Sequence, residues 1–219
     1  MQDVNRTVAP FIIAKIELQS AVKNFSEILK TASALMVARG DLGLEMPPED
    51  VPVAQKDIIA SCLKAGKPVI VATQMMESMT HAPRPTRAEV SDVANAVIDH
   101  TDAVMLSGET ATGEYPVETV EMMNKTIRET EASRYDDLAR MTRIKTRMTR
   151  IVEDLKKKPP GVQAILLACA NVYKCAQAVS RLRPEMPIFA PCPDASTAQA
   201  LTLSWGVYPF FLPNFEPGE

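Results

Sequence analysis

The sequence predicts an α/β protein built on parallel strands. Four short runs of β-branched or aliphatic residues each have the length of one strand, and they lie at 11–16, 34–38, 68–72 and 102–106. Their hydrophobicity is nearly continuous rather than alternating, which is typical of parallel strands buried on both faces. Helical patterns separate the runs, and repeated strand–helix units with short connections imply right-handed crossovers. This periodicity fits both an open doubly wound sheet and part of a closed barrel.

The helices between these runs are marked by apolar spacing and by capping residues. Apolar side chains recur at helical intervals within 54–63 and within 90–98. The second of these helices opens with Thr86 followed three residues later by Glu89, which is a capping-box pattern. Pro116 suits the first turn of a further helix at 117–132.

A change of composition after residue 133 divides the chain. Residues 134–160 are rich in Arg, Lys and Met, lack a strand pattern and end in two prolines, so they are interpreted as a helical linker. The linker separates a first domain at 1–133 from a second, smaller α/β domain at 161–219. In the second domain we expect strands at 164–168, 187–190 and 207–210, with helices at 172–182 and 196–204. A sheet with these strands alone is expected to be incomplete.

Composition argues against nucleic-acid and membrane partners. The 219 residues carry a formal net charge of −3, with acidic and basic residues interspersed. No apolar run approaches the roughly 20 residues that cross a bilayer, and the N-terminus lacks a signal-peptide pattern, so a cytoplasmic protein is expected. The 4 cysteines form no C-x-x-C pair and the 2 histidines have no second ligand nearby, so ordinary thiols and surface imidazoles are expected.

Charged residues follow the first two predicted strands. Lys15 and Glu17 are two residues apart, so a strand places them on the same face. Asp41 follows the next strand, and parallel neighbours lie about 4.8 Å apart, so Glu17 and Asp41 are expected to converge. Two carboxylates with substrate oxygens suit a magnesium ion. The alternative is a structural Lys15–Glu17 ion pair beside a polar turn at 39–41.

The third and fourth strands also end in polar residues, at Thr73 and Ser107. Several ordered motifs run along the chain, and they comprise Ile13-Ala14-Lys15-Ile16-Glu17, Met36-Val37-Ala38-Arg39-Gly40-Asp41-Leu42-Gly43, Ala65-Gly66-Lys67-Pro68, Ala72-Thr73-Gln74-Met75, Arg84-Pro85-Thr86-Arg87-Ala88-Glu89, Ser91-Asp92-Val93-Ala94-Asn95-Ala96 and Met105-Leu106-Ser107-Gly108-Glu109-Thr110-Ala111. Together these motifs resemble those of the pyruvate kinase family, and the resemblance covers nearly the whole chain, more weakly after Ser133.

The resemblance implies a fold and a reaction. The four strands would be the fifth to eighth of a TIM (β/α)8 barrel, so the expected fold is a partial barrel followed by an incomplete C-terminal α/β domain. The reaction would transfer a phosphoryl group from phosphoenolpyruvate to ADP, giving pyruvate and ATP. Magnesium or manganese and also potassium are the implied cofactors, but the potassium ligands of the family have no counterpart in this chain.

The resemblance also assigns roles to the charged residues. Glu17 and Asp41 would bind the divalent cation, and Asp41 would also contact the substrate. Lys15 would face the phosphoryl group in transfer and neutralise its charge.

The remaining roles concern the substrate carboxylate and the proton. Backbone amides around Ala38, Arg39 and Gly40 would receive the carboxylate, and a loop that enters a helix there supplies suitable N–H groups. Thr73 would line the proton-delivery side, through a water molecule, with Ser107 nearby. A threonine hydroxyl is a poor acid by itself, so Thr73 is expected to orient that water.

Several departures leave other functions open. Leu18 stands where the family usually has a small polar residue, and the loop at 168–173 lacks the Thr/Ser-rich pattern of a phosphate cradle. The first four barrel strands have no counterpart here, so a non-catalytic half-barrel that acts in assembly or regulation is an alternative to the enzyme. Another phosphoenolpyruvate or pyruvate barrel enzyme is a third reading. With open sheet edges, the chain is expected to form a homo-oligomer or to associate with the missing half.

Overall fold

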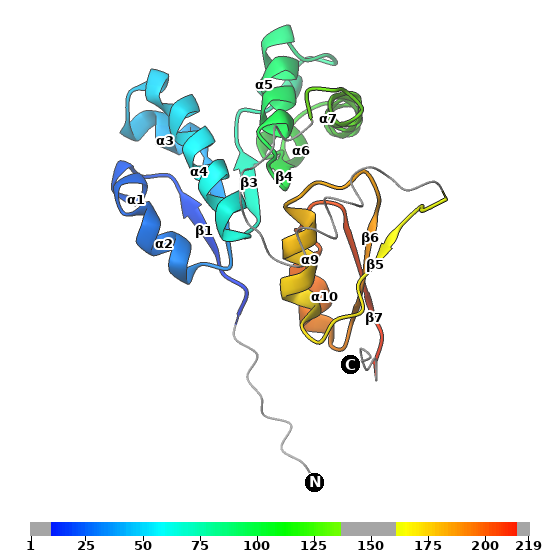
Figure 1. The fold of residues 1–219 in the computed structure, drawn as a ribbon. Helices are drawn as coiled ribbons and strands as arrows, with labels where there is room; N and C mark the ends of the chain where they lie inside the picture. The colour runs from blue at the N-terminus through cyan, green and yellow to red at the C-terminus, as the bar shows by residue number, and fades with distance from the viewer. Residues whose placement is uncertain (1–9, 137–160, 214–219) are drawn as a thin grey trace.

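The computed structural model describes residues 10–136 and 161–213, which form two α/β units, each with its own parallel sheet (Figure 1). The first sheet has the order β1-β2-β3-β4. Its strands are β1 (Ile13–Ile16), β2 (Ala34–Ala38), β3 (Val69–Ala72) and β4 (Ala103–Met105). Each lies inside one of the four predicted runs, and every neighbouring pair is parallel. The sheet is open, as expected for part of a barrel.

Burial differs between the inner and outer strands of this sheet. All four residues of β3 are buried, and β2 is nearly as buried, as their continuous hydrophobicity predicts. The expectation of burial on both faces is wrong for β1, where Ile13 is 41% exposed. That strand forms an edge of an open sheet, so one of its faces lacks a covering layer.

The helices of the first unit follow the strands in alternation. They are α1 (Gln19–Lys23), α2 (Phe25–Thr31), α3 (Arg39–Glu45), α4 (Val51–Ala65), α5 (Arg87–Ile98), α6 (Gly108–Ala111) and α7 (Pro116–Glu131), with 3-10 turns η1 (Pro48–Asp50) and η2 (Glu77–Thr80). The predictions of α4, α5 and α7 are confirmed. Neither α1 nor α2 was predicted, because segments this short carry too few apolar positions for a helical period to be seen.

Local sequence signals explain where the longer helices begin and end. The capping box at α5 is confirmed, since Thr86 Oγ1 accepts from the Glu89 N–H at 3.2 Å and Glu89 Oε2 accepts from the Thr86 N–H at 2.7 Å. Pro116 is the first residue of α7. Gly66 ends α4 with φ 67°, in the left-handed region where glycine is favoured.

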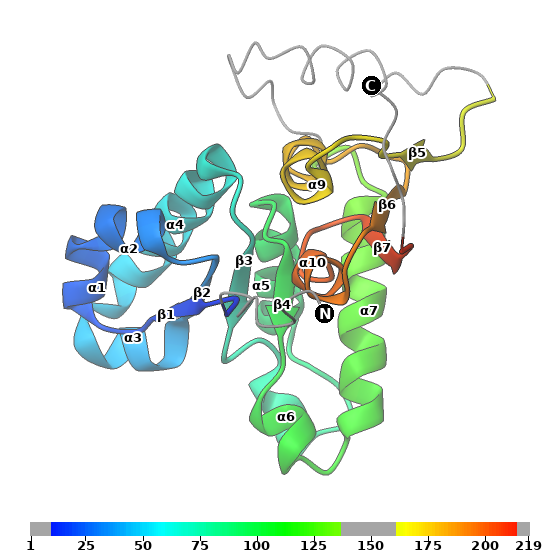
Figure 2. The same ribbon diagram turned by 90° about the horizontal axis from the view of Figure 1, so that it is seen from below.

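The second unit has a sheet of order β5-β6-β7, with strands β5 (Ile165–Leu166), β6 (Ile188–Cys192) and β7 (Val207–Phe211) and helices α9 (Val172–Ser180) and α10 (Ala195–Leu201) (Figure 2). Both helices pack on one face of the sheet. On the other face the register aligns Leu166, Phe189 and Tyr208, which are 66, 38 and 58% exposed. The predicted linker lies outside the described residues from 137 onward, so the domain boundaries at 133 and 160 stay predictions.

A buried ion pair joins the two units. Arg183 Nη1 lies 3.0 Å from Asp102 Oδ1, and the two side chains are only 3 and 8% exposed. The guanidinium also donates to the His100 carbonyl oxygen and lies 5.1 Å from the centre of the Trp205 ring. Trp205 Nε1 in turn donates to Glu131 Oε1 at 2.8 Å. The second unit is therefore held against β4 and α7 by polar contacts as well as by packing.

The cysteine expectation is correct for one pair and wrong for the other. Cys62 and Cys192 are free and buried. Cys169 and Cys175 are joined as a disulfide between the loop after β5 and helix α9. Their spacing matches no familiar redox motif, and they meet only because the loop turns back into the helix.

Candidate functional site

The parallel register brings the carboxyl ends of the four strands of the first sheet to one edge. Ile16 pairs with Val37, Ala38 with Ala72, and Ala72 with Met105. The predicted site residues lie at these positions or close to them in the sequence. Polar groups from four separate segments of the chain therefore share one edge of the sheet, which is where parallel α/β folds place their functional groups.

Lys15 stands between the two predicted metal ligands. Its ammonium is paired with the Glu17 carboxylate and lies 3.1 Å from Asp41 Oδ2. All three side chains are partly exposed to solvent. The hydrogen bonds to Glu17 and then to Asp41 raise the pKa of Lys15 above its usual value. We call Lys15, Glu17 and Asp41 the charged cluster.

The charged cluster has a donor set that fits a hard divalent cation. Two carboxylates from adjacent strand ends already converge on one positive charge, and Mg²⁺ is commonly held by one or two carboxylates, with substrate and water oxygens completing its shell. Within residues 10–136 and 161–213, no group of three or more His, Cys, Asp or Glu side chains is placed to hold a metal. Any cation here would therefore need oxygen ligands in addition to these two carboxylates.

Thr73 lies at the end of β3 and is bonded to the start of α3. Its hydroxyl accepts from the Gly40 N–H at 2.8 Å and donates to the Ala72 carbonyl at 2.6 Å. A Cβ at position 40 would lie 3.4 Å from Thr73 Oγ1, which is ordinary van der Waals contact, so this bond does not by itself require a glycine. The Gly40 amide, predicted to receive a substrate carboxylate, is thus engaged by Thr73, and a ligand would have to displace that hydroxyl. Ala38 is buried at the end of β2.

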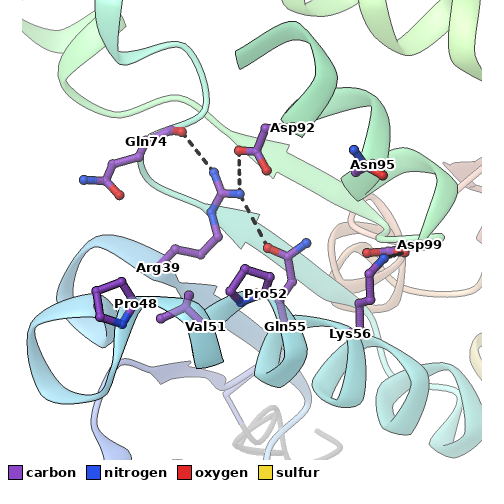
Figure 3. Close-up of a pocket in the computed structure, with 11 residues that line it drawn as sticks. Arg39, Pro48, Val51, Pro52, Gln55, Lys56, Gln74, Asp92, Asn95 and Asp99 are labelled. Atoms are coloured by element: carbon purple, nitrogen blue, oxygen red, sulfur yellow. Dashed lines mark hydrogen bonds and ion pairs between the residues drawn. The ribbon is translucent and has the colours of Figure 1, made fainter. Parts of the chain in front are cut away.

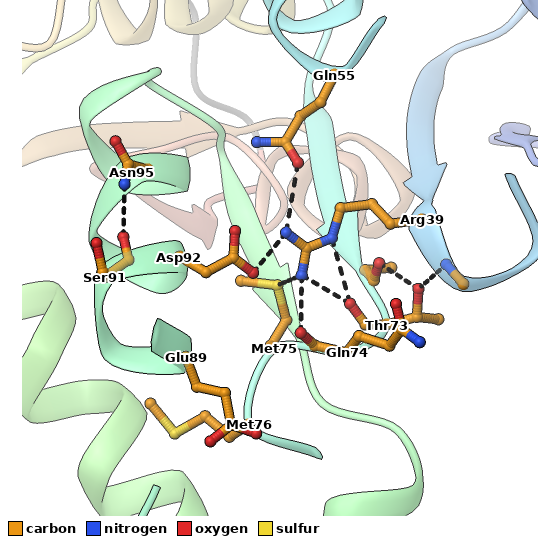
Figure 4. Close-up of polar contacts among 12 residues, drawn as sticks. Arg39, Gln55, Thr73, Gln74, Met75, Met76, Glu89, Ser91, Asp92 and Asn95 are labelled. Atoms are coloured by element: carbon orange, nitrogen blue, oxygen red, sulfur yellow. Dashed lines mark hydrogen bonds and ion pairs between the residues drawn. The ribbon is translucent and has the colours of Figure 1, made fainter. Parts of the chain in front are cut away.

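The Arg39 side chain was not predicted to have a role, yet it makes the densest set of contacts in the site (Figure 4). Its Nη2 donates to the Thr73 carbonyl at 2.8 Å and to the Gln74 carbonyl at 3.0 Å. On its other side, Nη1 lies 2.6 Å from Asp92 Oδ2 on α5. The sequence motif containing Arg39 was visible, but its partners are 16 to 53 positions away and could not be identified from spacing.

Ser107 and Glu109 connect the fourth strand to the third. Ser107 is exposed at the start of α6, and its backbone N–H donates to Glu109 Oε2 at 2.8 Å. Glu109 is only 1% exposed, and its Oε1 accepts from the Met76 N–H at 3.2 Å. Sequence reasoning missed Glu109 as a buried residue of the site edge, although it lies in the same motif as Ser107.

A cavity of about 360 Å³ opens beside the site, between α4 and α5 (Figure 3). Its lining includes Arg39, Gln55, Gln74, Asp92 and Asn95. The charged cluster and Thr73 do not line it. The Arg39 side chain therefore contacts both regions, since it lines this cavity and also donates to the Thr73 carbonyl at the strand-end site.

None of the helices in the described part of the chain is both long and apolar enough to cross a bilayer.

Comparisons with known proteins agree on one family. The description "Pyruvate kinase, barrel domain" matches residues 3–120, and "Pyruvate kinase, alpha/beta domain" matches residues 161–217. A pyruvate kinase of Agaricus bisporus is 49% identical over 213 residues, which are 93% of this chain and 40% of the relative. One of Geobacillus stearothermophilus is 48% identical over 203 residues, which are 90% of this chain and 34% of the relative. The chain thus spans about two fifths or less of the length of these two relatives.

Proposed function

The chain belongs to the pyruvate kinase family, and on this basis we propose that it forms the part of a pyruvate kinase that carries the divalent-cation ligands and the phosphoryl-facing lysine. The observation that supports this proposal is the charged cluster, in which a lysine and two carboxylates from neighbouring strands meet at the carboxyl edge of a parallel sheet. A structural ion pair alone needs only one carboxylate.

The proposed reaction is phosphoryl transfer from phosphoenolpyruvate to ADP. The bond from phosphorus to the enol oxygen breaks, and a bond forms from phosphorus to a terminal β-phosphate oxygen of ADP, giving ATP. The electron pair of the broken bond leaves an enolate, which takes a proton at its methylene carbon to become pyruvate. Catalysis of such a transfer consists mostly of positioning and of stabilising charge.

Lys15 suits the charge-stabilising role. Its pKa is raised by Glu17 and Asp41, so the ammonium stays protonated throughout the physiological range. A positive charge fixed beside the transferring group is most useful as negative charge spreads over the phosphoryl oxygens. We propose that Lys15 serves that purpose once a substrate is bound.

Glu17 and Asp41 would hold Mg²⁺ or Mn²⁺, which would supply Lewis-acid neutralisation of the negative charge on the substrate. Asp41 would contact the substrate as well. Potassium is expected for the family, and its ligands would come from outside this chain.

The substrate carboxylate and the proton are assigned to the other strand ends. The backbone around Ala38, Arg39 and Gly40 would receive the carboxylate, displacing the Thr73 hydroxyl from the Gly40 amide. The displaced hydroxyl of Thr73 would then be available to orient a water molecule toward the methylene carbon. Ser107, exposed at the end of β4, would lie on the same side.

The partners of the chain follow from its open sheet. Ile13 in edge strand β1 and Ile12 just before it are 41 and 55% exposed, so association with a second copy or with a complementary half-barrel is proposed. A non-catalytic assembly module remains the alternative, and it predicts association without turnover.

The test is a pyruvate-coupled kinase assay on three samples: this chain alone, a complete enzyme that carries this segment, and the same complete enzyme with Lys15→Met. The complete enzyme should form pyruvate and ATP, the chain alone should not, and Lys15→Met should lower kcat far more than it changes KM. Arg128→Met, an exposed position on α7, is the matched control for loss of a cation. An inactive complete enzyme that still binds Mn²⁺ would favour the assembly module.

A further inference from the structure

The chain turns sharply after β3 through two residues in an unfavourable conformation. Thr73 and Gln74 have φ values of 68° and 52°, both in the left-handed region. This region is disfavoured for residues that carry a Cβ, and a β-branched residue such as threonine is a genuine outlier there. Such conformations persist when surrounding contacts hold them, and they concentrate at functional sites.

The contacts to the carbonyl oxygens of this turn come from one side chain. Arg39 reaches from the end of β2 and donates through Nε and Nη2 to the Thr73 carbonyl, at 3.3 and 2.8 Å, and through Nη2 to the Gln74 carbonyl at 3.0 Å. The same Nη2 lies 2.8 Å from Met75 Sδ. Acceptors from three consecutive residues therefore gather around one edge of one guanidinium (Figure 4).

The far edge of the guanidinium is anchored by other elements. Nη1 lies 2.6 Å from Asp92 Oδ2 on α5 and 3.5 Å from Gln55 Oε1 on α4. The Arg39 side chain is only 10% exposed, and Gln55 is 6% exposed. The position of Arg39 is thus fixed by two helices as well as by its own backbone.

We propose that Arg39 is a positioning residue, which holds the Thr73–Gln74 turn so that the Thr73 hydroxyl stays beside Gly40 and the charged cluster even when a bound substrate has taken the Gly40 amide. The inference deepens the proposed function, because it assigns Arg39 to the step in which the enolate is protonated. Arg39 acts there through Thr73 and does not touch the reacting atoms itself.

The geometry requires a guanidinium rather than any cation. Arginine offers five N–H donors in a fixed planar fork, and Arg39 uses both edges of that fork at once. A lysine ammonium is a single point with three donors on a flexible stem, so it cannot reach the turn and Asp92 together. Arg39→Lys should therefore behave as a loss of function and not as a conservative change.

The affected step should be proton transfer. When the turn relaxes, the Thr73 hydroxyl should move away from the strand-end site, where it would orient the water molecule, while Lys15, Glu17 and Asp41 keep their own contacts. A misplacement of about 1 Å at a reacting group can cost about 10²-fold in rate. Substrate binding should change little, because a side-chain substitution at position 39 leaves in place both the charged cluster and the backbone amides that would receive the carboxylate.

The first experiment uses a complete enzyme that carries this segment. In Arg39→Lys and Arg39→Ala, kcat should fall about 10²-fold with KM for phosphoenolpyruvate near the wild-type value. Deuterium incorporation at the methyl group of pyruvate, followed by NMR in D₂O with Mg²⁺ and K⁺, should fall at least as much. Millimolar guanidinium should partly restore Arg39→Ala but not Lys15→Met. Arg128→Lys is the control for an exposed arginine and should match the wild type.

The second experiment needs no activity. Hydrogen exchange of this 219-residue chain should show faster exchange in peptides covering 72–76 in Arg39→Lys, with α7 and the second unit unchanged. Unchanged exchange at 72–76 would overturn the proposal, as would loss of turnover without loss of deuterium incorporation. If the wild-type enzyme were inactive but the exchange pattern were as expected, the proposed function would be rejected, while the conclusion that Arg39 holds the Thr73–Gln74 turn would stand.

Discussion

The ion pair between the two units gives the most quantitative prediction, through the substitution Arg183→Met. Breaking a buried pair by removing one partner leaves the other charge uncompensated, which typically costs about 3–5 kcal/mol. Asp102 would keep two backbone donors, the Val69 N–H at 3.0 Å and the Trp205 N–H at 3.2 Å. Arg183 Nε is buried without a partner, so the native pair is not ideal either. We therefore expect a loss of about 3 kcal/mol in the free energy of unfolding, at the low end of that range.

The measurement uses the fluorescence of Trp205, which is the only tryptophan in the sequence and lies at this junction. Urea unfolding of the wild type and of Arg183→Met gives the difference in free energy from the shift of the transition. Adding Asp102→Asn should recover part of the loss, because the double variant no longer buries an unpaired charge. Lys125→Met is the control, since its pair with Glu121 is exposed, and it should cost less than about 0.5 kcal/mol. A loss below about 1 kcal/mol for Arg183→Met would refute the reasoning that the pair is buried and coupled.

Three further predictions concern single groups. Burial alone would raise the pKa of Glu89, but hydrogen bonds from Ser78 and Thr86 outweigh burial and lower the pKa. The contribution of ionised Glu89 to the free energy of unfolding is therefore complete above the unfolded pKa of about 4.3, and it is lost as pH falls through the folded pKa. Urea midpoints measured over that pH range should fall less steeply in Glu89→Gln than in the wild type. Burial raises the pKa of Cys62 to about 12, so iodoacetamide at mildly alkaline pH should label it only after unfolding, as mass spectrometry of the alkylated chain would reveal. Glu17→Ala together with Asp41→Ala should abolish Mn²⁺ binding in isothermal titration, and unchanged binding would place the metal elsewhere.

The sequence predicts the strands and the long helices because each carries a repeated local signal. The runs that became β2 and β3 are continuous in hydrophobicity and are buried as expected. Thr86 and Glu89 predict the start of α5 to the residue, because a capping box is a contact between neighbours in sequence. The position of the site at the strand ends follows from the same pattern, since parallel strands present their carboxyl ends on one edge.

What the sequence does not predict depends on contacts between distant residues. The Arg39 guanidinium lies among the carbonyls of Thr73 and Gln74 only because β2 and β3 are adjacent, and its pairing with Asp92 depends on how α5 packs. Left-handed φ values at two residues that are not glycine have no local sequence signal. The burial of Glu109 was missed for a related reason, because an isolated glutamate after a strand usually faces solvent.

Polar contacts connect the ends of the four strands one after another, and these contacts stabilise the site edge of the open sheet. Lys15 joins β1 to Asp41 after β2, Arg39 joins β2 to the turn after β3, and Glu109 joins that turn to the end of β4. Each tie uses a charged group that bonds to backbone or to an opposite charge, and charge-assisted hydrogen bonds are stronger than neutral ones. The ties at Arg39 and Glu109 are nearly buried, whereas the tie at Lys15 is open to solvent and lies at the edge of the sheet. Order along the site edge should therefore decrease from β3 toward β1. The proposed metal ligands Glu17 and Asp41 lie toward β1, so they should gain the most rigidity if the proposed partner covers that strand.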